Sequence, residues 1–155
     1  NMGVPSSIAP VARRINERMP ILSAEKILDG IGEKENPRIL ILGFSYKPEL
    51  GDCRMTPVLP LVNELSKKTN DILIWDPHVD ERDFPNGFKR IEDPESVENL
   101  DAVILATAHS ACIGIDWSIL KRNCDPAFLF DGRRSLDPER MKSMGWKYSG
   151  VGYPG

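Results

Sequence analysis

Short apolar runs alternate with amphipathic segments along most of this chain, starting after residue 37. The first run, residues 38–44, is rich in β-branched and aliphatic residues, as is typical of a strand buried on both faces. Further strands are predicted at residues 71–75, 89–91, 101–107, 127–131 and 147–151. Helices are predicted between them, at residues 56–68, 95–99, 117–122 and 138–144. Strands and helices that alternate in this way favour a mostly parallel, doubly wound, Rossmann-like α/β sheet.

The beginning of the chain has a different pattern, which predicts a helical lead-in. Its apolar residues recur at helical spacing, at Ile8, Val11, Ile15, Met19 and Leu22. Ser6 or Ser7 is suited to cap this helix, and Pro20 is expected to kink or divide it. A polar break at residues 32–37 follows. We therefore expect a helical lead-in, residues 1–36, and one compact α/β domain, residues 37–155.

Composition excludes several classes of protein. The 155 residues carry 20 Lys and Arg against 23 Asp and Glu, a formal charge of −3, which disfavours binding along a nucleic-acid backbone. No apolar run approaches the roughly 20 residues of a membrane span, and no secretory signal is visible, so no membrane association is expected. The odd number of cysteines, Cys53, Cys112 and Cys124, lacks CxxC spacing and argues against a disulfide framework or a zinc site. A cytoplasmic protein is expected.

The first strand is followed by a long turn that lacks the GxGxxG pattern of a dinucleotide site. Only Gly43 is in place, and the turn carries Lys47 and Arg54 instead. Ligands of such sheets bind at the carboxyl ends of the strands, and Arg133 follows a strand at that same edge. Cations on one rim of an acidic domain indicate an anionic ligand, with a diphosphate favoured.

Other residues near this rim have two interpretations. Phe44 and Tyr46 are candidates for a flat surface under a nucleobase. Asp76 stands where a ribose-binding carboxylate often lies, but without the glycine pattern a turn residue before Pro77 is favoured. His109 follows the central strand and has either a ligand contact or a role in loop structure.

No nucleophile or paired-carboxylate centre stands out in the sequence. Cys53 has no His near it in the sequence, which argues against a nucleophile, and Cys112 and Cys124 fit packing or loop positions. Surface lysines and arginines are usually solvated, so each cation of the rim also has that simpler interpretation.

The motifs of this chain resemble those of the UDP-glucose/GDP-mannose dehydrogenase superfamily. Residues 43–57, GFSYKPELGDCRMTP, are similar to the family loop Gxx(Y/F)KxxxxDxRx(S/T)P. Residues 130–133, FDGR, with LD at 136–137, are similar to its FDGRxxLD signature. The stretches ARRINERMP at 12–20, WDP at 75–77 and ATAH at 106–109 also match the family pattern. The resemblance covers nearly the whole chain.

The family oxidises the C6 hydroxymethyl group of a nucleotide-linked hexose to a carboxylate, in two NAD+-dependent steps. Its members combine an N-terminal NAD-binding domain, a middle helical dimerisation region with a catalytic cysteine, and a C-terminal UDP-sugar-binding domain. The resemblance implies that residues 1–36 are the end of the middle region and residues 37–155 the C-terminal domain. The GxGxxG and GxCxxKD motifs are absent from this chain, so it is expected to be part of a larger enzyme and inactive alone, with no catalytic or metal-binding residue.

Carried over by position, the resemblance gives roles to four residues. Tyr46, Lys47 and Arg133 match residues that contact the UDP-sugar. Arg54 matches an arginine that reaches NAD held by the N-terminal domain across a cleft. Asp52 is expected to orient Arg54. For Arg134, which has no firm family counterpart, a solvated arginine is favoured.

Several alternatives remain open from the sequence. The chain is either the binding domain of a UDP-sugar 6-dehydrogenase or a non-catalytic nucleotide-binding or scaffold module; a free-standing NAD-binding domain is disfavoured by the first turn. The RINxxMP pattern at residues 14–20 favours a UDP-N-acetylhexosamine over UDP-glucose as substrate. A homodimer or larger assembly of the full protein is expected, because the family dimerises through its middle region.

Overall fold

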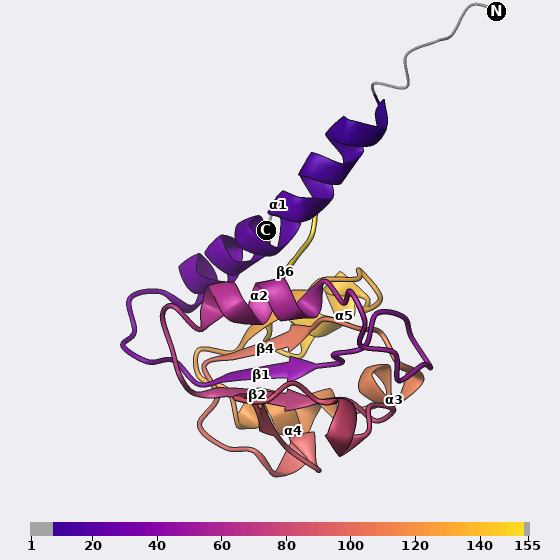
Figure 1. Cartoon of the computed structure of the whole chain (residues 1–155). Helices are drawn as coiled ribbons and strands as arrows, with labels where there is room; N and C mark the ends of the chain where they lie inside the picture. The colour runs from indigo at the N-terminus through magenta and orange to yellow at the C-terminus, as the bar shows by residue number, and fades with distance from the viewer. Residues whose placement is uncertain (1–7, 154–155) are drawn as a thin grey trace, which may run out of the picture.

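A six-stranded sheet forms the centre of the molecule (Figure 1). The computed structural model describes residues 8–153, with side chains described from residue 12 onward. The strands lie in the order β3-β2-β1-β4-β5-β6 and every neighbouring pair is parallel. They are β1 (Ile39–Leu42), β2 (Ile72–Trp75), β3 (Lys89–Arg90), β4 (Ala102–Leu105), β5 (Phe128–Asp131) and β6 (Lys147–Gly150). The predicted doubly wound, Rossmann-like sheet is confirmed, and its strand order reverses between β1 and β4.

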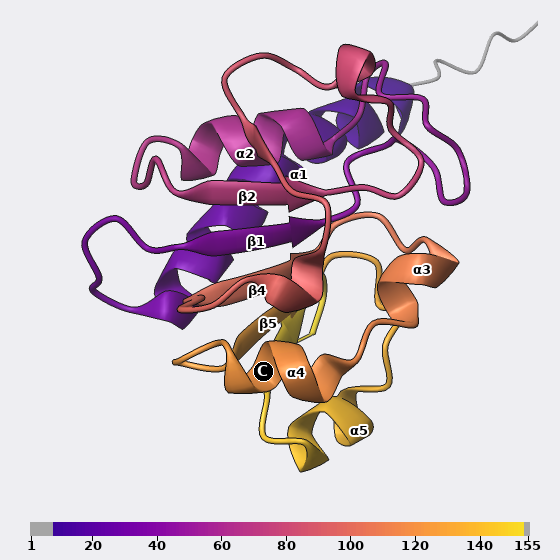
Figure 2. The ribbon, with the colours of Figure 1, turned by 90° about the horizontal axis from the view of Figure 1, so that it is seen from below.

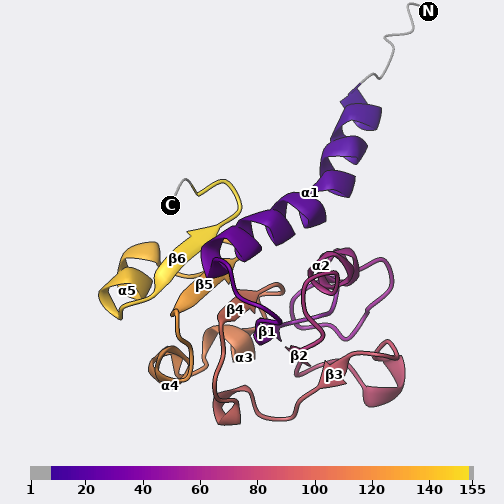
Figure 3. The same ribbon diagram turned by 90° about the vertical axis from the view of Figure 1, so that its left-hand side faces the viewer.

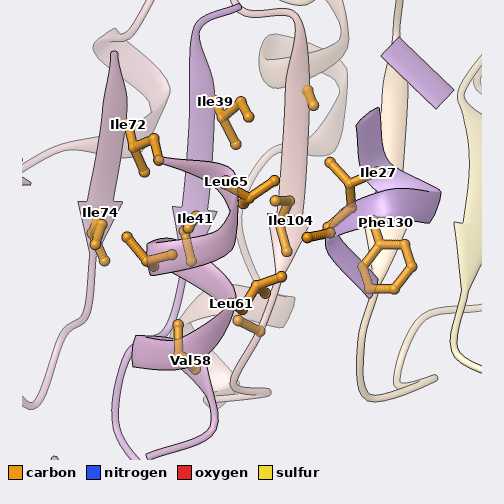
Figure 4. Close-up of a cluster of buried hydrophobic side chains, with 14 of the residues drawn as sticks. Ile27, Ile39, Ile41, Val58, Leu61, Leu65, Ile72, Ile74, Ile104 and Phe130 are labelled. Atoms are coloured by element: carbon orange, nitrogen blue, oxygen red, sulfur yellow. The ribbon is translucent and has the colours of Figure 1, made fainter. Parts of the chain in front are cut away.

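Helices cover both faces of the sheet because successive residues of each strand point to opposite sides. One face packs against α1 (Ile8–Ile31) and α2 (Val58–Leu65). Figure 4 shows Ile39 and Ile41 of β1 on this face, close to Leu61 and Leu65 of α2. The opposite face buries Leu40 and Leu42 of β1 against α4 (Trp117–Arg122) and α5 (Pro138–Ser143). A short helix, α3 (Ser110–Ile113), follows β4.

The long helix α1 runs through Pro20 without a break. Its axis changes direction about midway, as Figure 3 shows, so the expected kink is present while the division is not. Among its described side chains, from residue 12 onward, those that pack in the core lie in the second half: Ala24, Ile27 and Ile31. Ile15 and Leu22 of the predicted apolar face are 55% and 46% exposed. Ser6 and Ser7, the predicted caps, lie outside the described residues.

Most of the predicted elements are found within one to three residues of their expected bounds. The prediction of a helix at 95–99 was wrong: a 3₁₀ turn, η2 (Pro94–Ser96), stands there. Asn99 has a left-handed φ of 58°, which the α-helix does not allow. The pattern also missed α3 and a second 3₁₀ turn, η1 (Glu81–Asp83), because four and three residues give no readable period. Within residues 8–153, no helix is long and apolar enough to cross a membrane.

Candidate functional site

Three segments meet the edge of the sheet where the strands end. We call residues 43–57, after β1, the Lys47 loop; residues 106–110, between β4 and α3, the β4–α3 segment; and residues 131–136, after β5, the Arg133 turn. Figure 2 shows the first two on the side toward which the strand arrows point. They flank the place where the strand order reverses, which is the usual ligand position in open α/β sheets.

Asp76, at the end of β2, is the buried anchor of this edge. The residue is 3% exposed, and Oδ2 accepts hydrogen bonds from the amides of Phe44 (2.7 Å) and Ser45 (2.9 Å). Oδ1 accepts from the amides of His78 (2.8 Å) and Val79 (3.2 Å). Burial raises the pKa of Asp76, but the hydrogen bonds from His109 and from these amides outweigh it and hold that pKa well below its usual range. The carboxylate is therefore ionised without a cationic side chain beside it.

His109 of the β4–α3 segment is completely buried beside Asp76. Its Nδ1 accepts the backbone N–H of Glu49 at 3.0 Å, so this nitrogen carries no proton. The neutral ring then carries its proton on Nε2, which lies 3.0 Å from Asp76 Oδ2 and 3.0 Å from Ser45 Oγ. Of the two interpretations of His109, the structure supports the role in loop structure. Both nitrogens are engaged within the protein, which leaves none for a ligand.

The Lys47 loop approaches the β4–α3 segment closely at its base. Thr107 Oγ1 donates to the carbonyl oxygen of Ser45 at 2.7 Å. Gly43 has a φ of 85°, and a Cβ atom on it would lie 2.5 Å from the carbonyl oxygen of Thr107. Only glycine meets both conditions. Phe44, proposed as a surface under a base, is 1% exposed in the core, so that prediction was wrong: the hydrogen bond that its backbone N–H donates to Asp76 turns this residue inward.

The outer part of the loop presents Tyr46 and Lys47 to solvent. The amide of Tyr46 donates to the carbonyl of Asp52 at 2.8 Å and so closes the loop. Lys47 Nζ lies 5.8 Å from the centre of the Tyr46 ring. Glu49 accepts the amide of Ser110 and lies 3.2 Å from His78 Nε2. Among residues 12–153, Lys47 forms no ion pair.

Arg133 is fixed to the same β4–α3 segment from the other side. Its Nε donates to the carbonyl of Ala106 at 2.8 Å, and its amide donates to Asp131 Oδ1 at 3.0 Å. Asp131 is fully buried and also accepts the amide of Leu136 (2.9 Å) and the Tyr148 hydroxyl (3.0 Å). The guanidinium of Arg133 is exposed and, within the described side chains, pairs with no carboxylate.

Arg54 differs from the other cations because a carboxylate holds it. Asp52 accepts from Nε and Nη2 of Arg54, each at 2.9 Å, and from its amide at 2.9 Å. These hydrogen bonds lower the pKa of Asp52 to about 2. Asp52 orients Arg54, as expected from the sequence. Arg134 is exposed, which fits its interpretation as a solvated arginine.

The cysteines show no sign of an activated thiolate. Burial, with the negative charges of Asp76, Asp83 and Asp52, raises the pKa of Cys53 to about 11. A nucleophile needs the opposite shift. Cys112 and Cys124 are buried in the core, where burial raises the pKa of each thiol to about 12. The interpretation of these two as packing residues fits their positions.

Neither a dinucleotide nor a metal fits the turn after β1. The amides of Phe44 and Ser45, which would face a pyrophosphate in a GxGxxG turn, donate to Asp76 instead. Glu49, His78 and His109 bring possible metal ligands within 4.8 Å of one another. Both nitrogens of His109 are already engaged, so two groups at most remain for a metal ion.

The four residues singled out from the sequence all lie exposed on segments that follow the carboxyl ends of strands: Tyr46, Lys47, Arg54 and Arg133. Their roles toward a ligand stay predictions. No role was predicted from the sequence for Ser45, Thr107 or Glu49. The available signal was position alone: Ser45 and Thr107 are small hydroxyl residues just past the ends of neighbouring strands.

The fold and this edge together define a Rossmann-type domain that presents cationic side chains where a dinucleotide-binding domain presents a glycine turn. Residues 40–138 match the UDP-glucose/GDP-mannose dehydrogenase family, UDP binding domain. The chain belongs to this family.

Individual relatives agree with the family match. The chain is 28% identical over 147 residues to UDP-N-acetyl-D-mannosamine dehydrogenase of Pyrococcus horikoshii, covering 92% of this chain and 32% of the relative. It is 28% identical over 143 residues to UDP-glucose 6-dehydrogenase 3 of Oryza sativa subsp. japonica, covering 76% and 30%. The structure of NDP-N-acetyl-D-galactosaminuronic acid dehydrogenase from Methanosarcina mazei Go1 superposes with a TM-score of 0.82 at 25% identity, covering 98% of this chain and 33% of that one. The chain thus spans about a third of the length of these relatives.

Proposed function

We propose that this chain is the C-terminal, nucleotide-sugar-binding domain of an NAD-dependent UDP-sugar 6-dehydrogenase. The enzyme would oxidise the C6 hydroxymethyl group of a UDP-hexose to a uronic acid. Residues 37–155 form the binding domain in this proposal, and residues 1–36 are the end of the middle dimerisation region. By itself the chain binds and does not catalyse.

One observation carries the proposal: two cations that pair with no carboxylate among residues 12–153 lie on segments attached to opposite sides of the β4–α3 segment. Arg133 is hydrogen-bonded to Ala106, and the Lys47 loop is hydrogen-bonded to Thr107 and His109. A diphosphate is an anion that Lys and Arg recognise well, Lys as a point charge and Arg through its planar fork.

Each residue of the proposed site has a distinct task. Lys47 offsets charge on the diphosphate, and Arg133 contacts the same ligand from the Arg133 turn. Tyr46, exposed next to Lys47, contributes an aromatic surface. Positioning of this kind brings the sugar C6 close to the reacting groups of the complete enzyme, and such orientation supplies a large share of a rate enhancement.

The remaining parts of the enzyme enter the proposal as partners. NAD belongs to an N-terminal domain of the same enzyme, and only Arg54 of this chain reaches toward it. Ile15, Ile21 and Leu22 are exposed on α1, which supports a homodimer or larger assembly through this helix. A nucleic acid and a membrane are not partners in this proposal. A cytoplasmic location is included because the three cysteines are free thiols, the state that a reducing compartment maintains.

A UDP-N-acetylhexosamine is the favoured substrate over UDP-glucose. The RINxxMP pattern at residues 14–20 supports this choice.

Calorimetric titration with UDP, with NAD+ in parallel, tests the proposal. Binding of UDP with no response to NAD+ is the expected result. Binding of NAD+ alone would overturn the assignment of the Lys47 loop. The alternative, a non-catalytic nucleotide-binding or scaffold module, is distinguished by the reading frame upstream of Asn1: a GxGxxG domain there supports the dehydrogenase, and its absence supports the module.

A further inference from the structure

The outer part of the Lys47 loop has little apolar packing to hold it in place. Every residue from 46 to 52 is exposed, including Lys47 itself. Glu49 moreover has a left-handed φ of 62°, which a residue with a side chain adopts only where its surroundings enforce it. Polar contacts therefore set the shape of this segment.

His109 supplies two of these contacts, one on each side of Lys47. Two residues before Lys47, the hydroxyl of Ser45 lies 3.0 Å from His109 Nε2 and donates to the Lys47 carbonyl at 3.1 Å. Two residues after Lys47, the amide of Glu49 donates to His109 Nδ1 at 3.0 Å. One buried ring thus holds both ends of the five-residue stretch that has Lys47 at its centre.

The ring itself is fixed independently of the loop's outer part. Asp76 Oδ2 lies 3.0 Å from Nε2, and the side chains of both residues are fully buried. Asp76 remains ionised and so favours the tautomer with the proton on Nε2. That tautomer leaves Nδ1 as the acceptor that the Glu49 amide requires.

We propose that His109 is a positioning residue: it fixes the backbone on both sides of Lys47 and so places this lysine for binding of a nucleoside diphosphate; this rests on the proposed function. His109 does not touch the ligand, because it is buried and both its nitrogens are engaged. It acts by keeping the loop in the conformation that presents Lys47 at the carboxyl edge of the sheet. Loss of the Glu49 contact lets the loop sample other conformations, and the apparent Kd rises in inverse proportion to the fraction of molecules whose loop remains competent to bind.

Two substitutions separate the two contacts of His109. A Gln side chain places its amide nitrogen three bonds beyond Cβ, like Nε2, so His109→Gln keeps a donor for Asp76 and loses the acceptor for Glu49. An Asn side chain places its oxygen two bonds beyond Cβ, like Nδ1, so His109→Asn keeps the acceptor and loses the donor. Leu100→Ala is the matched control, because it removes a fully buried side chain at the opposite edge of the sheet.

The readouts are amide hydrogen exchange of Glu49 by NMR, the Kd for UDP by calorimetry, and urea unfolding of each variant. In His109→Gln we expect exchange at Glu49 and the Kd for UDP each to rise about tenfold, while exchange in β1 and β4 stays slow. His109→Asn is expected to keep the Glu49 amide protected. Leu100→Ala is expected to lower stability and leave both loop readouts unchanged.

Unchanged exchange at Glu49 and an unchanged Kd in His109→Gln would overturn the positioning role. So would an equal loosening of the loop in Leu100→Ala, since His109 would then act only through overall stability. If instead the proposed function is wrong, the unaltered chain does not bind UDP at all, which is a different result from a raised Kd in the variant. In that case the exchange of Glu49 still decides whether His109 fixes the loop.

Discussion

At the amino edge of the sheet, the buried carboxylate of Asp101 pairs with the ammonium group of Lys34, whereas at the carboxyl edge Asp76 is satisfied by backbone amides and His109. Both arrangements meet the need of a buried charge for partners. Their effect on the surface is opposite. At the amino edge the cation and the carboxylate neutralise each other, while at the carboxyl edge backbone amides and His109 satisfy Asp76, and among the described side chains no carboxylate pairs with Lys47. An anion-binding edge therefore depends on how its own buried anions are satisfied.

The largest expected effect comes from removing each of the two buried carboxylates, Asp76 and Asp101, in turn. Asp76→Ala leaves several buried amides without an acceptor, and each such group costs roughly 1–3 kcal/mol. We expect the free energy of unfolding to fall by about 3–5 kcal/mol, measured by urea denaturation followed by circular dichroism. Asp101→Ala is the control and is expected to cost less, because it frees the half-exposed Lys34 and only one amide, that of Arg38. Equal losses in the two variants would contradict the contrast.

The second test compares the cations of the two edges, Lys47 and Lys34. Lys47→Ala removes an exposed charge that forms no ion pair with the described side chains, so stability should change by no more than about 0.5 kcal/mol. The Kd for UDP is expected to rise about 10- to 100-fold, or about 1.4–2.8 kcal/mol. Lys34→Ala at the amino edge is the matched control and should leave the Kd for UDP unchanged. Full affinity in Lys47→Ala would remove the proposed binding role of this residue.

Lowering the pH should reduce the free energy of unfolding, because protonation of Asp76 weakens its hydrogen bonds. The folded-state pKa of Asp76 lies below the value of about 3.9 for an unfolded chain, so its stabilising contribution is complete above about pH 5 and is lost as the pH falls toward the folded pKa. Asp76→Asn lacks this contribution at every pH. The difference in unfolding free energy between the two proteins should therefore narrow from pH 7 to about pH 3. A constant difference would show that Asp76 does not titrate in this way.

The smallest expected effect is at the one carboxyl-edge cation that does have a carboxylate partner. Carbon-13 NMR of the Asp52 carboxyl should give a titration midpoint of about 2, because Arg54 binds both of its oxygens. Arg54→Gln is expected to return that midpoint toward about 3.9, the value of a free Asp. Because the pair is exposed, we expect little change in stability. A midpoint near 3.9 in the unaltered chain would mean that Arg54 is as free as Lys47.

The pattern of apolar runs was sufficient to predict the sheet and the edge at which the four predicted residues lie. Trp117–Arg122 was predicted to the residue, since it is flanked by clear polar breaks. The interior of the site could not be predicted, because its contacts join residues far apart in the sequence. His109 meets Ser45 and Glu49 across 64 and 60 positions, and no local pattern encodes such a meeting.

The same reason explains the error at Phe44. Its place just after a strand suggested an exposed ring beside Tyr46. A hydrogen bond to Asp76, 32 positions away, sets the direction of the chain there. Residues near a site were thus predictable by type and edge, while their orientation depended on partners that only the folded chain brings close.

The close approach of Gly43 to Thr107 bears on attempts to redesign this domain. Grafting the two missing glycines of a GxGxxG turn would not produce a dinucleotide site, because the amides of Phe44 and Ser45 would still point inward to Asp76. Gly43 serves here as a spacer between two backbones and not as a cradle for phosphate. Changing the ligand class of this domain therefore requires replacing Asp76 and rebuilding the turn around it, a far larger change than the loop sequence suggests.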